Sequence, residues 1–163
     1  MKRILILVLL FGAFLTAEAQ ETTFFLIRHA EKDRSNPNER NPHLTLEGRQ
    51  RATRWSVVLS QVDLDAVYST DYHRTVETAK STARKQKLAI QFYDPKNMYS
   101  DEFKEATEGK KVLVVGHSNT TPFFANKIIG EDIYEQIEDD NNANLYIVTI
   151  KNGEISHHFL KIN

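Results

Sequence analysis

The sequence predicts an α/β fold in three layers, with a mostly parallel central sheet and helices on both faces. Short apolar runs of strand length, clearest at residues 23–27 and 111–115, alternate with stretches in which apolar residues recur at helical spacing. The chain closes with two strand-like segments around Asn152-Gly153, a dipeptide typical of two-residue hairpin turns. Alternating strands and helices favour parallel pairing, so an antiparallel hairpin should complete a largely parallel sheet.

The strands are expected where apolar or β-branched residues gather between turn signals. The expected ranges are 23–27, 66–69, 88–93, 111–115, 145–150 and 155–160. Residues 23–27 and 111–115 are continuous apolar runs, as expected for strands that are covered on both faces. These two strands should therefore lie in the middle of the sheet.

Four helices are expected between the strands. The first follows a Thr45 cap and carries the apolar stripe Trp55, Val58, Leu59 and Val62; the second follows a Thr70 or Asp71 cap and carries Tyr72, Val76, Ala79 and Ala83. A short helix is expected within residues 97–107. The last should run from about Thr121 to Ile129, with Pro122 in its first turn and Gly130 past its end.

The first 19 residues have the pattern of a secretory signal. Lys2-Arg3 precedes the apolar residues 4–15, and Ala17-Glu18-Ala19 fits a cleavage site. A retained anchor is the weaker alternative, because about twelve apolar residues fall short of the roughly 20 that span a bilayer. We expect residues 1–19 to be removed, residues 20–163 to form a single domain, and the protein to be secreted, into a bacterial periplasm.

The composition excludes several classes of partner and site. The chain has 21 Lys and Arg against 22 Asp and Glu, a net charge of −1, which gives no electrostatic case for nucleic acid or for an anionic membrane surface. It has no cysteine, so disulfides, thiol nucleophiles and thiolate metal sites are excluded. The expected partner is a small molecule, with no stable membrane association after signal cleavage.

Basic side chains follow the predicted strands at one edge of the sheet. Arg28 and His29 end the first strand, His117 follows the central strand at 111–115, and Arg74 lies just after the strand at 66–69. Ligands of open α/β sheets bind beyond the carboxyl ends of the strands, where these side chains should converge. Two arginines and two histidines without an acidic cluster predict an anion site. Phosphate fits best, because a guanidinium offers two parallel donors to its oxygens.

A histidine in such a pocket makes chemistry possible as well as binding. A neutral imidazole can attack phosphorus while the cationic neighbours stabilise the transferring oxygens, which gives a phosphohistidine. The attacking nitrogen must be unprotonated, so the other ring nitrogen should donate to a fixed acceptor such as a backbone carbonyl. The second histidine should act in protonated form, as a donor to a phosphate oxygen.

Four sequence blocks together resemble a known family. They are Arg28-His29-Ala30-Glu31; Leu44-Thr45-Leu46-Glu47-Gly48 with Gln50 and Ala52; Tyr68-Ser69-Thr70 with Arg74-Thr75 and Thr78-Ala79; and Val114-Val115-Gly116-His117-Ser118-Asn119. In this order, from about Phe24 to Gly130, they resemble the histidine phosphatase superfamily, which has the phosphoglycerate mutase-like fold. The short chain resembles the phosphohistidine phosphatase type rather than a mutase.

The resemblance implies roles for individual residues. It makes His29 the phosphate-accepting nucleophile and places Arg28, Arg74 and His117 in the phosphate pocket. Ser118 or Asn119 could add a donor at the start of the following helix. A phosphate ester or another phosphorylated small molecule is the implied substrate, and no metal or organic cofactor is implied.

The general acid is the part of the family pattern that is hardest to locate. Ser118 occupies the position directly after the second histidine, where one branch of the family has its acid. The segment 101–108 is the other candidate region, and Glu102 or Glu105 is the predicted acid. Without an acid, phosphohistidine or acyl phosphate substrates would be favoured, because their leaving groups depart without a proton.

Three questions stay open from the sequence. Glu31 and Lys32 could line the mouth of the pocket or pair on the surface. The chain could be a phosphate or phosphosugar binding module with no useful turnover instead of a phosphatase. A metal-dependent hydrolase that uses His29, Glu31 and His117 is a third reading.

Overall fold

The computed structural model describes residues 21–162, which contain one six-stranded sheet. Its strands are β1 (Glu21–Arg28), β2 (Ala66–Ser69), β3 (Ile90–Phe92), β4 (Lys111–Gly116), β5 (Asn144–Lys151) and β6 (Glu154–Lys161). Their order across the sheet is β3-β2-β4-β1-β5-β6. The first four pair in parallel, and β5 and β6 form an antiparallel hairpin beside β1. The predicted mostly parallel α/β sheet with a C-terminal hairpin is confirmed.

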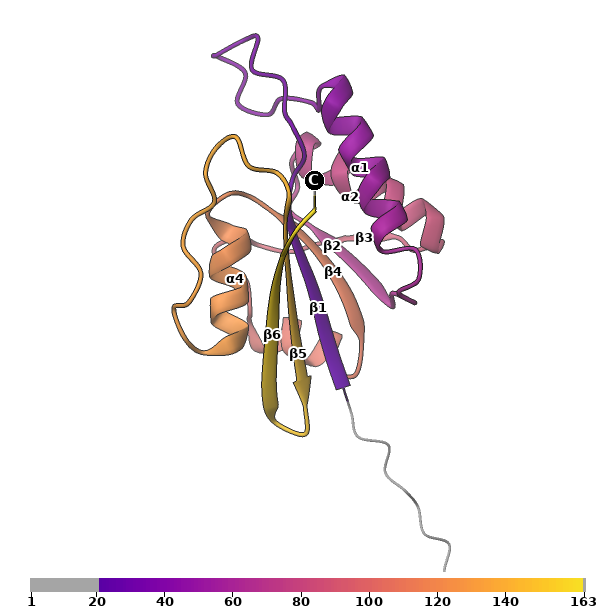
Figure 1. Cartoon of the computed structure of the whole chain (residues 1–163), viewed down its shortest axis with the longest axis vertical. Coiled ribbons are helices and arrows are strands. Elements are labelled where there is room, and N and C mark those ends of the chain that lie inside the picture. Colours follow the sequence, from indigo (N-terminus) through magenta and orange to yellow (C-terminus); the bar gives the residue numbers. More distant parts are fainter. Residues whose placement is uncertain (1–20, 163) are drawn as a thin grey trace, which may run out of the picture.

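Helices cover both faces of this sheet (Figure 1). They are α1 (Leu46–Val58), α2 (His73–Gln86), α3 (Asp101–Thr107) and α4 (Thr120–Ile129). On one face Trp55 of α1 and Ala79 of α2 pack against Val67 and Leu113 of the sheet. On the other face α3 and α4 pack against the sheet in a second core cluster that is rich in aromatic residues. The predicted three-layer arrangement is therefore confirmed.

Two helices begin or end at a different residue from the one that periodicity predicts. Helix α1 ends at Val58, which is 37% exposed, so the buried stripe stops at Trp55 and Leu59. Helix α2 begins after Tyr72, and the side chain of Tyr72 makes no capping hydrogen bond. Tyr72 is 39% exposed, whereas Thr70 is fully buried. The hydroxyl of Thr70 bonds inside the molecule instead of capping the helix.

The hairpin turn has the backbone that its sequence predicts. Asn152 has φ 53° and Gly153 has φ 82°, so both turn residues are left-handed. This conformation matches the twist of the flanking strands in a two-residue turn.

Strands β1 and β4 are neighbours in the middle of the sheet. Their parallel register places Arg28 opposite Gly116, and β2 flanks β4 on its other side. The residues that follow these strands, His29, His117 and Thr70, therefore meet at one edge, as the sequence predicts.

The predicted signal at residues 1–19 lies outside the described residues. Within residues 21–162, no helix combines the length and the apolar character that crossing a membrane requires.

Candidate active site

The structure brings the two histidines and two arginines together at the carboxyl edge of the sheet. The ring centroids of His29 and His117 are 5.6 Å apart, and Nη2 of Arg74 lies 3.4 Å from Nδ1 of His117. Arg28 and His29 are 1% and 3% exposed. The four side chains thus form one compact site, in which Arg28 and His29 are buried and Arg74 and His117 are partly exposed.

His29 is held by its backbone and by one ring nitrogen. Its N–H donates to the carbonyl of Gly116 at 2.9 Å, and its carbonyl accepts from Nδ2 of Asn142 at 2.7 Å. Ring atom Nδ1 lies 2.7 Å from the carbonyl oxygen of Ala30. Because a carbonyl can only accept, Nδ1 carries the proton and Nε2 keeps a free lone pair. This is the tautomer that a nucleophilic histidine requires.

The surroundings of His29 also keep its ring neutral. Burial lowers the pKa of His29 to about 3, the hydrogen bond to Ala30 opposes this effect, and the charges of Arg28 and Arg74 reinforce it. At neutral pH the imidazole is therefore uncharged, and its Nε2 is available for attack.

Arg28 is bound on one side by the segment between α4 and β5. Nη1 donates to the carbonyls of Glu138 at 2.7 Å and of Asn141 at 2.9 Å, and Nη2 pairs with the carboxylate of Asp139 at 3.0 Å. Nε of Arg28 is buried without a hydrogen-bond partner among the described residues. The guanidinium is thus fixed in place with an N–H group left unused.

Arg74 has two further donors of this kind. Both its Nε and its Nη1 are buried without a partner in the part of the chain that the structure describes. Burying a charged donor without a partner costs free energy that a bound anion would recover. A phosphate group, with several acceptor oxygens, fits the unused donors of Arg28 and Arg74.

His117 is neutral in this arrangement as well. Burial lowers its pKa to about 4, and Arg74 and Arg28 add to the effect. The protonated form that the sequence predicts for this histidine therefore needs a bound anion, whose negative charge would raise the pKa again.

The Leu-Thr-x-x-Gly block fastens α1 to the loop that follows His29. The N–H and Oγ1 of Thr45 both donate to the carbonyl of Glu31, at 2.9 and 3.2 Å, while Oγ1 caps the helix by accepting from the N–H of Gly48 at 3.0 Å. A Cβ at position 48 would lie 2.2 Å from the same carbonyl oxygen. Only glycine lets α1 approach this closely.

Two other block residues have comparable roles. Oγ1 of Thr78 accepts from the N–H of Ala30 at 2.9 Å and donates to the carbonyl of Arg74 at 2.6 Å, so it joins α2 to the nucleophile loop. A Cβ at Gly116 would lie 2.8 Å from Oγ1 of Thr121 and 2.9 Å from the hydroxyl of Tyr93. Glycine before His117 is therefore required by packing.

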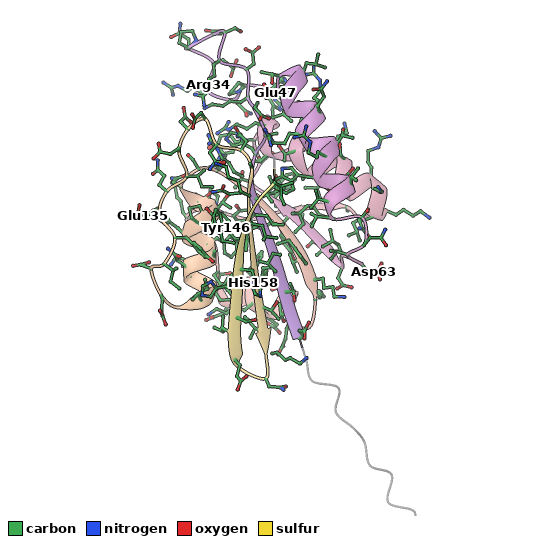
Figure 2. The ribbon with its side chains drawn as sticks, in the orientation of Figure 1. Arg34, Glu47, Asp63, Glu135, Tyr146 and His158 are labelled. Atoms are coloured by element: carbon green, nitrogen blue, oxygen red, sulfur yellow. The ribbon has the colours of Figure 1, made fainter. Side chains whose placement is uncertain are left out.

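A polar cleft of about 300 Å³ opens beside His29. Its lining residues are His29, Glu31, Lys32, Arg34, Glu47, Arg51, Asp139, Asp140 and Asn142; Figure 2 shows Arg34 and Glu47 at that end of the molecule. Glu31 pairs with Nε of Arg51 at 2.6 Å, and burial and neighbouring arginines lower the pKa of Lys32. Both residues whose place the sequence leaves open thus lie at the mouth of the site.

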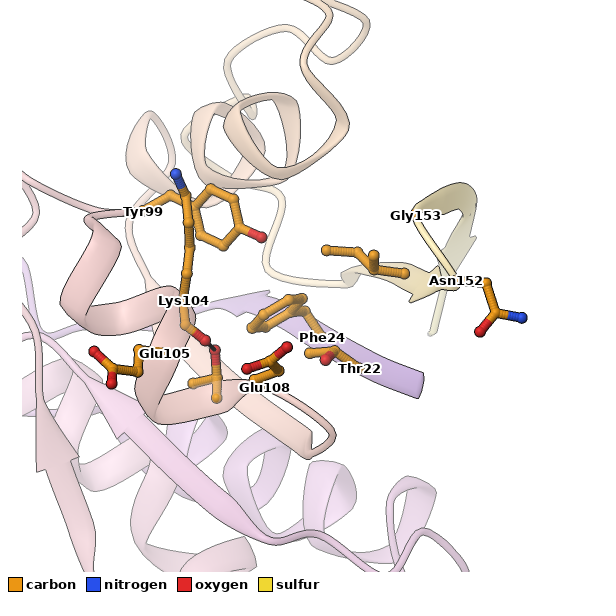
Figure 3. A pocket seen from close by; sticks show the side chains of 10 residues that line it. Thr22, Phe24, Tyr99, Lys104, Glu105, Glu108, Asn152 and Gly153 are labelled. Carbon is orange, nitrogen blue, oxygen red and sulfur yellow. Dashed lines mark hydrogen bonds between the residues drawn. The ribbon is translucent and has the colours of Figure 1, made fainter. Parts of the chain in front are cut away.

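The two predicted acids lie elsewhere. Glu105 lines a different cavity of about 530 Å³, together with Thr22 and Gly153 at the amino end of β1 (Figure 3). Thr22 and His29 are seven residues apart along an extended chain, or roughly 23 Å. Glu102 is exposed on the first turn of α3, and a hydrogen bond from Ser100 lowers its pKa, which favours the ionised form rather than the acid. The structure brings neither carboxylate to the histidines.

Ser118 and Asn119 follow His117 at the start of α4. Asn119 is exposed and makes no side-chain capping bond, and the carbonyl of Ser118 accepts from the N–H of Ile137 at 2.8 Å. Their role as phosphate donors stays a prediction.

The segment before β5 forms one side of the site, and the sequence patterns did not predict it. Asn142 supports the carbonyl of His29, and Glu138, Asp139 and Asn141 bind Arg28. The run Asp139-Asp140-Asn141-Asn142, directly before an apolar strand, was the available signal. Among residues 21–162 no group of three or more His, Asp or Glu side chains is arranged to hold a metal ion.

Comparison with known proteins supports the family assignment. Residues 24–95 match the family model of the histidine phosphatase superfamily (branch 1). This stretch contains the first three of the four blocks, so the resemblance that the motifs predict is confirmed. A search of curated proteins gave no match.

Solved structures of similar fold include phosphatases and a mutase. Phosphoserine phosphatase from Entamoeba histolytica, solved as a mutant with phosphoserine, is 14% identical with a TM-score of 0.66 over 85% of this chain and 96% of that chain. A putative phosphohistidine phosphatase SixA from Agrobacterium tumefaciens is 19% identical with a TM-score of 0.61 over 85% and 97%. Phosphoglycerate mutase from Bacillus anthracis is 15% identical with a TM-score of 0.66 over 87% and 93%. These likenesses show a phosphoglycerate mutase-like fold.

Proposed function

We propose that this protein is a metal-independent phosphatase that acts through a phosphohistidine on His29. The match to the histidine phosphatase family model and the phosphoglycerate mutase-like fold support this proposal. The observation that carries the proposal is the pairing of a neutral His29, with Nε2 unprotonated, and buried guanidinium donors of Arg28 and Arg74 that lack partners among the described residues. A nucleophile and an anion site meet at one point.

The geometry supports a reaction in two steps. The phosphoryl group of the substrate binds the unused N–H groups of Arg28 and Arg74. Nε2 of His29 forms a bond to phosphorus while the bond from phosphorus to the leaving atom breaks. That atom, an oxygen in an ester or acyl phosphate and a nitrogen in phosphohistidine, takes the electron pair. Water then attacks the phosphorus of the phosphohistidine, which releases inorganic phosphate and restores His29.

The leaving group is the part of the substrate that this site limits most. Of the four carboxylates that line the cleft, Glu31 and Asp139 pair with arginines, whereas Glu47 and Asp140 form no ion pair among the described residues. None of the four is hydrogen-bonded to His29 or His117 in the described part of the chain. The hydrogen bond from Arg34 holds the pKa of Asp139 below its usual range, so this carboxyl group stays ionised and is a poor proton donor. We therefore expect substrates whose leaving groups need no proton, such as phosphohistidine, acyl phosphates or aryl phosphates, to react faster than alkyl phosphates.

Hydrolysis of an aryl and an alkyl phosphate in the presence of a chelator tests the proposal, with His29→Ala as control. We expect aryl phosphate turnover that the chelator does not affect and that the variant lacks. Radiolabelled substrate, quenched in alkali, should leave label on the wild type only, because a phosphoramidate survives alkali. Tight phosphate binding without turnover would instead favour the binding module, and loss of activity with chelator would favour a metal enzyme.

We propose further that the protein is exported, on the sequence of residues 1–19 alone. Expression of the full chain in a bacterium, followed by fractionation and determination of the N-terminus, tests this. A periplasmic product that begins at Gln20 is expected, and a cytoplasmic product that retains Met1 would contradict export.

A further inference from the structure

The side of His117 that faces away from Arg74 contacts a buried hydroxyl. Nε2 of His117 lies 2.9 Å from Oγ1 of Thr70, and Thr70 is fully buried. We propose that Thr70 and Thr75 form a hydrogen-bond chain that fixes His117 as the Nε2–H tautomer and leaves Nδ1 unprotonated on the side of Arg74. The consequence for catalysis rests on the proposed function, but the tautomer itself does not.

The far end of the chain determines its direction. The hydroxyl of Thr75 lies 2.8 Å from the carbonyl of Thr70 and 2.9 Å from the carbonyl of Tyr72. Carbonyls only accept, so the single hydroxyl proton of Thr75 is used there. Thr75 must then accept from the hydroxyl of Thr70, at 3.0 Å. The proton of Thr70 is used in turn, so Thr70 can only accept from Nε2–H of His117.

The opposite end of the imidazole leads to the same tautomer independently. Nη2 of Arg74 lies 3.4 Å from Nδ1 of His117. A guanidinium has donors and no acceptor, so Nδ1 must be the unprotonated nitrogen. The carbonyls that bind Thr75 and the guanidinium of Arg74 thus lead to the same result, a His117 ring with its proton on Nε2.

The two histidines of the site are therefore opposite tautomers. His29 carries its proton on Nδ1 and attacks with Nε2, whereas His117 carries its proton on Nε2 and, when an anion is bound, takes up a second one from water on Nδ1. Thr70 stabilises the resulting imidazolium, because a hydrogen bond to a charged donor is stronger than one to a neutral donor. Thr70 and Thr75 act through His117, so they are positioning residues.

Several charged or titratable groups surround His117, and the positive ones among them lower its pKa. Tyr72 and Arg74 of α2 lie against the ring, His29 approaches it from the end of β1, and Arg28 and Lys32 lower its pKa through their charges. Of the groups that contact the ring nitrogens, Thr70 can accept from Nε2–H and Arg74 can donate to Nδ1, so both favour the proton on Nε2.

NMR of the ¹⁵N-labelled wild-type protein tests the tautomer directly. Long-range proton–nitrogen correlations distinguish protonated from unprotonated ring nitrogens, and loss of one set of signals in His117→Gln assigns His117. We expect protonated Nε2 and unprotonated Nδ1 at neutral pH, without phosphate. A protonated Nδ1 would overturn the proposal, whether or not the protein hydrolyses any substrate.

The catalytic consequence is tested with three isosteric or conservative variants. Thr70→Val removes the acceptor, so the basic limb of the kcat profile should move down by about one pH unit. Thr70→Ser keeps a hydroxyl acceptor, so its basic limb should lie at the wild-type pH. Thr82→Val is the matched control, because Thr82 is a buried α2 threonine whose hydroxyl has no partner in the described chain.

The outcomes separate the inference from the proposed function. A folded Thr70→Val protein with the wild-type pH profile would overturn the positioning role, and so would an equal shift in Thr82→Val. If Thr70→Val does not fold, Thr75→Val makes the same test, because it frees the Thr70 proton, so Thr70 is no longer a fixed acceptor for Nε2–H and the basic limb should again move to lower pH. Absence of any phosphatase activity would count against the proposed phosphatase function. The NMR result would still decide whether His117 is the Nε2–H tautomer.

Discussion

The two ends of the sheet both carry a cavity, and they differ in how their buried polar groups are paired. The amino-end cavity is the larger, about 530 Å³ against about 300 Å³ for the cleft beside His29. Its buried hydroxyls are satisfied, since Thr22 accepts from the N–H of Gly109 and Thr107 donates to the carbonyl of Phe103. At the carboxyl end, guanidinium N–H groups are buried without partners among the described residues. Buried guanidinium donors without partners therefore point to the proposed active site, whereas cavity volume points to the other end.

The largest effect that would sharpen this contrast is expected from Arg74→Lys. An ammonium is a point charge and cannot replace two directed guanidinium donors, so kcat/KM should fall by about 10²-fold or more. The thermal stabilisation of the protein by inorganic phosphate should fall in parallel. Arg84→Lys, at an exposed position on the same helix, is the matched control. Equal activity in Arg74→Lys and wild type would remove Arg74 from the site.

A second expected effect is the dependence of stability on pH. The pKa values of His29 and His117 are about 3 and about 4 in the native protein, against 6.5 when unperturbed. Between pH 6.5 and about 4 the unfolded chain therefore binds protons that the native protein does not. The free energy of unfolding should fall with decreasing pH by up to about 1.4 kcal/mol per unit for each histidine.

Urea unfolding at pH 7, 6 and 5 measures this slope. His29→Gln should reduce it, because one of the two buried imidazoles is gone. The exposed His158 (Figure 2) provides the control, and His158→Gln should keep the wild-type slope. If His29→Gln and His158→Gln both keep the wild-type slope of unfolding free energy against pH, the pKa of His29 is not lowered in the native protein.

A smaller effect is expected at the segment before β5. Asn142→Ala removes the donor to the carbonyl of His29, which leaves a buried acceptor unpaired at a cost of about 1–2 kcal/mol. Because the nucleophile loses one of its supports, kcat should fall by about 10-fold while KM changes less. Asn36→Ala, in the exposed loop, is the control. A change in KM alone would instead place Asn142 in substrate binding.

The smallest effect is expected at the amino end. Glu105→Gln should leave kcat within about two-fold of wild type, because the carboxylate lines the other cavity. A large loss, concentrated on alkyl phosphates, would instead identify Glu105 as the acid that the sequence predicts. That result would remove the distinction between the two ends.

Sequence reasoning predicted the strands and the four central side chains because both depend on residue type. Apolar runs report burial, and strand ends locate the site edge in a parallel sheet. It could not find the partners of Arg28, because two of them are backbone carbonyls and any residue has one. The Glu105 prediction could have been avoided: residues just before the strand that begins at Lys111 must lie at its amino end, opposite the histidines.

Gly48 shows how a mutational screen of this protein would be misread. A side chain there would collide with the carbonyl of Glu31, the residue next to Ala30, whose own carbonyl fixes the proton of His29. A steric change on the inner side of an ordinary helix would thus disturb the nucleophile through two adjoining peptide units. Substitutions of Gly48 would therefore lower activity as substitutions in the proposed active site do, although Gly48 has no side chain that could take part in the reaction.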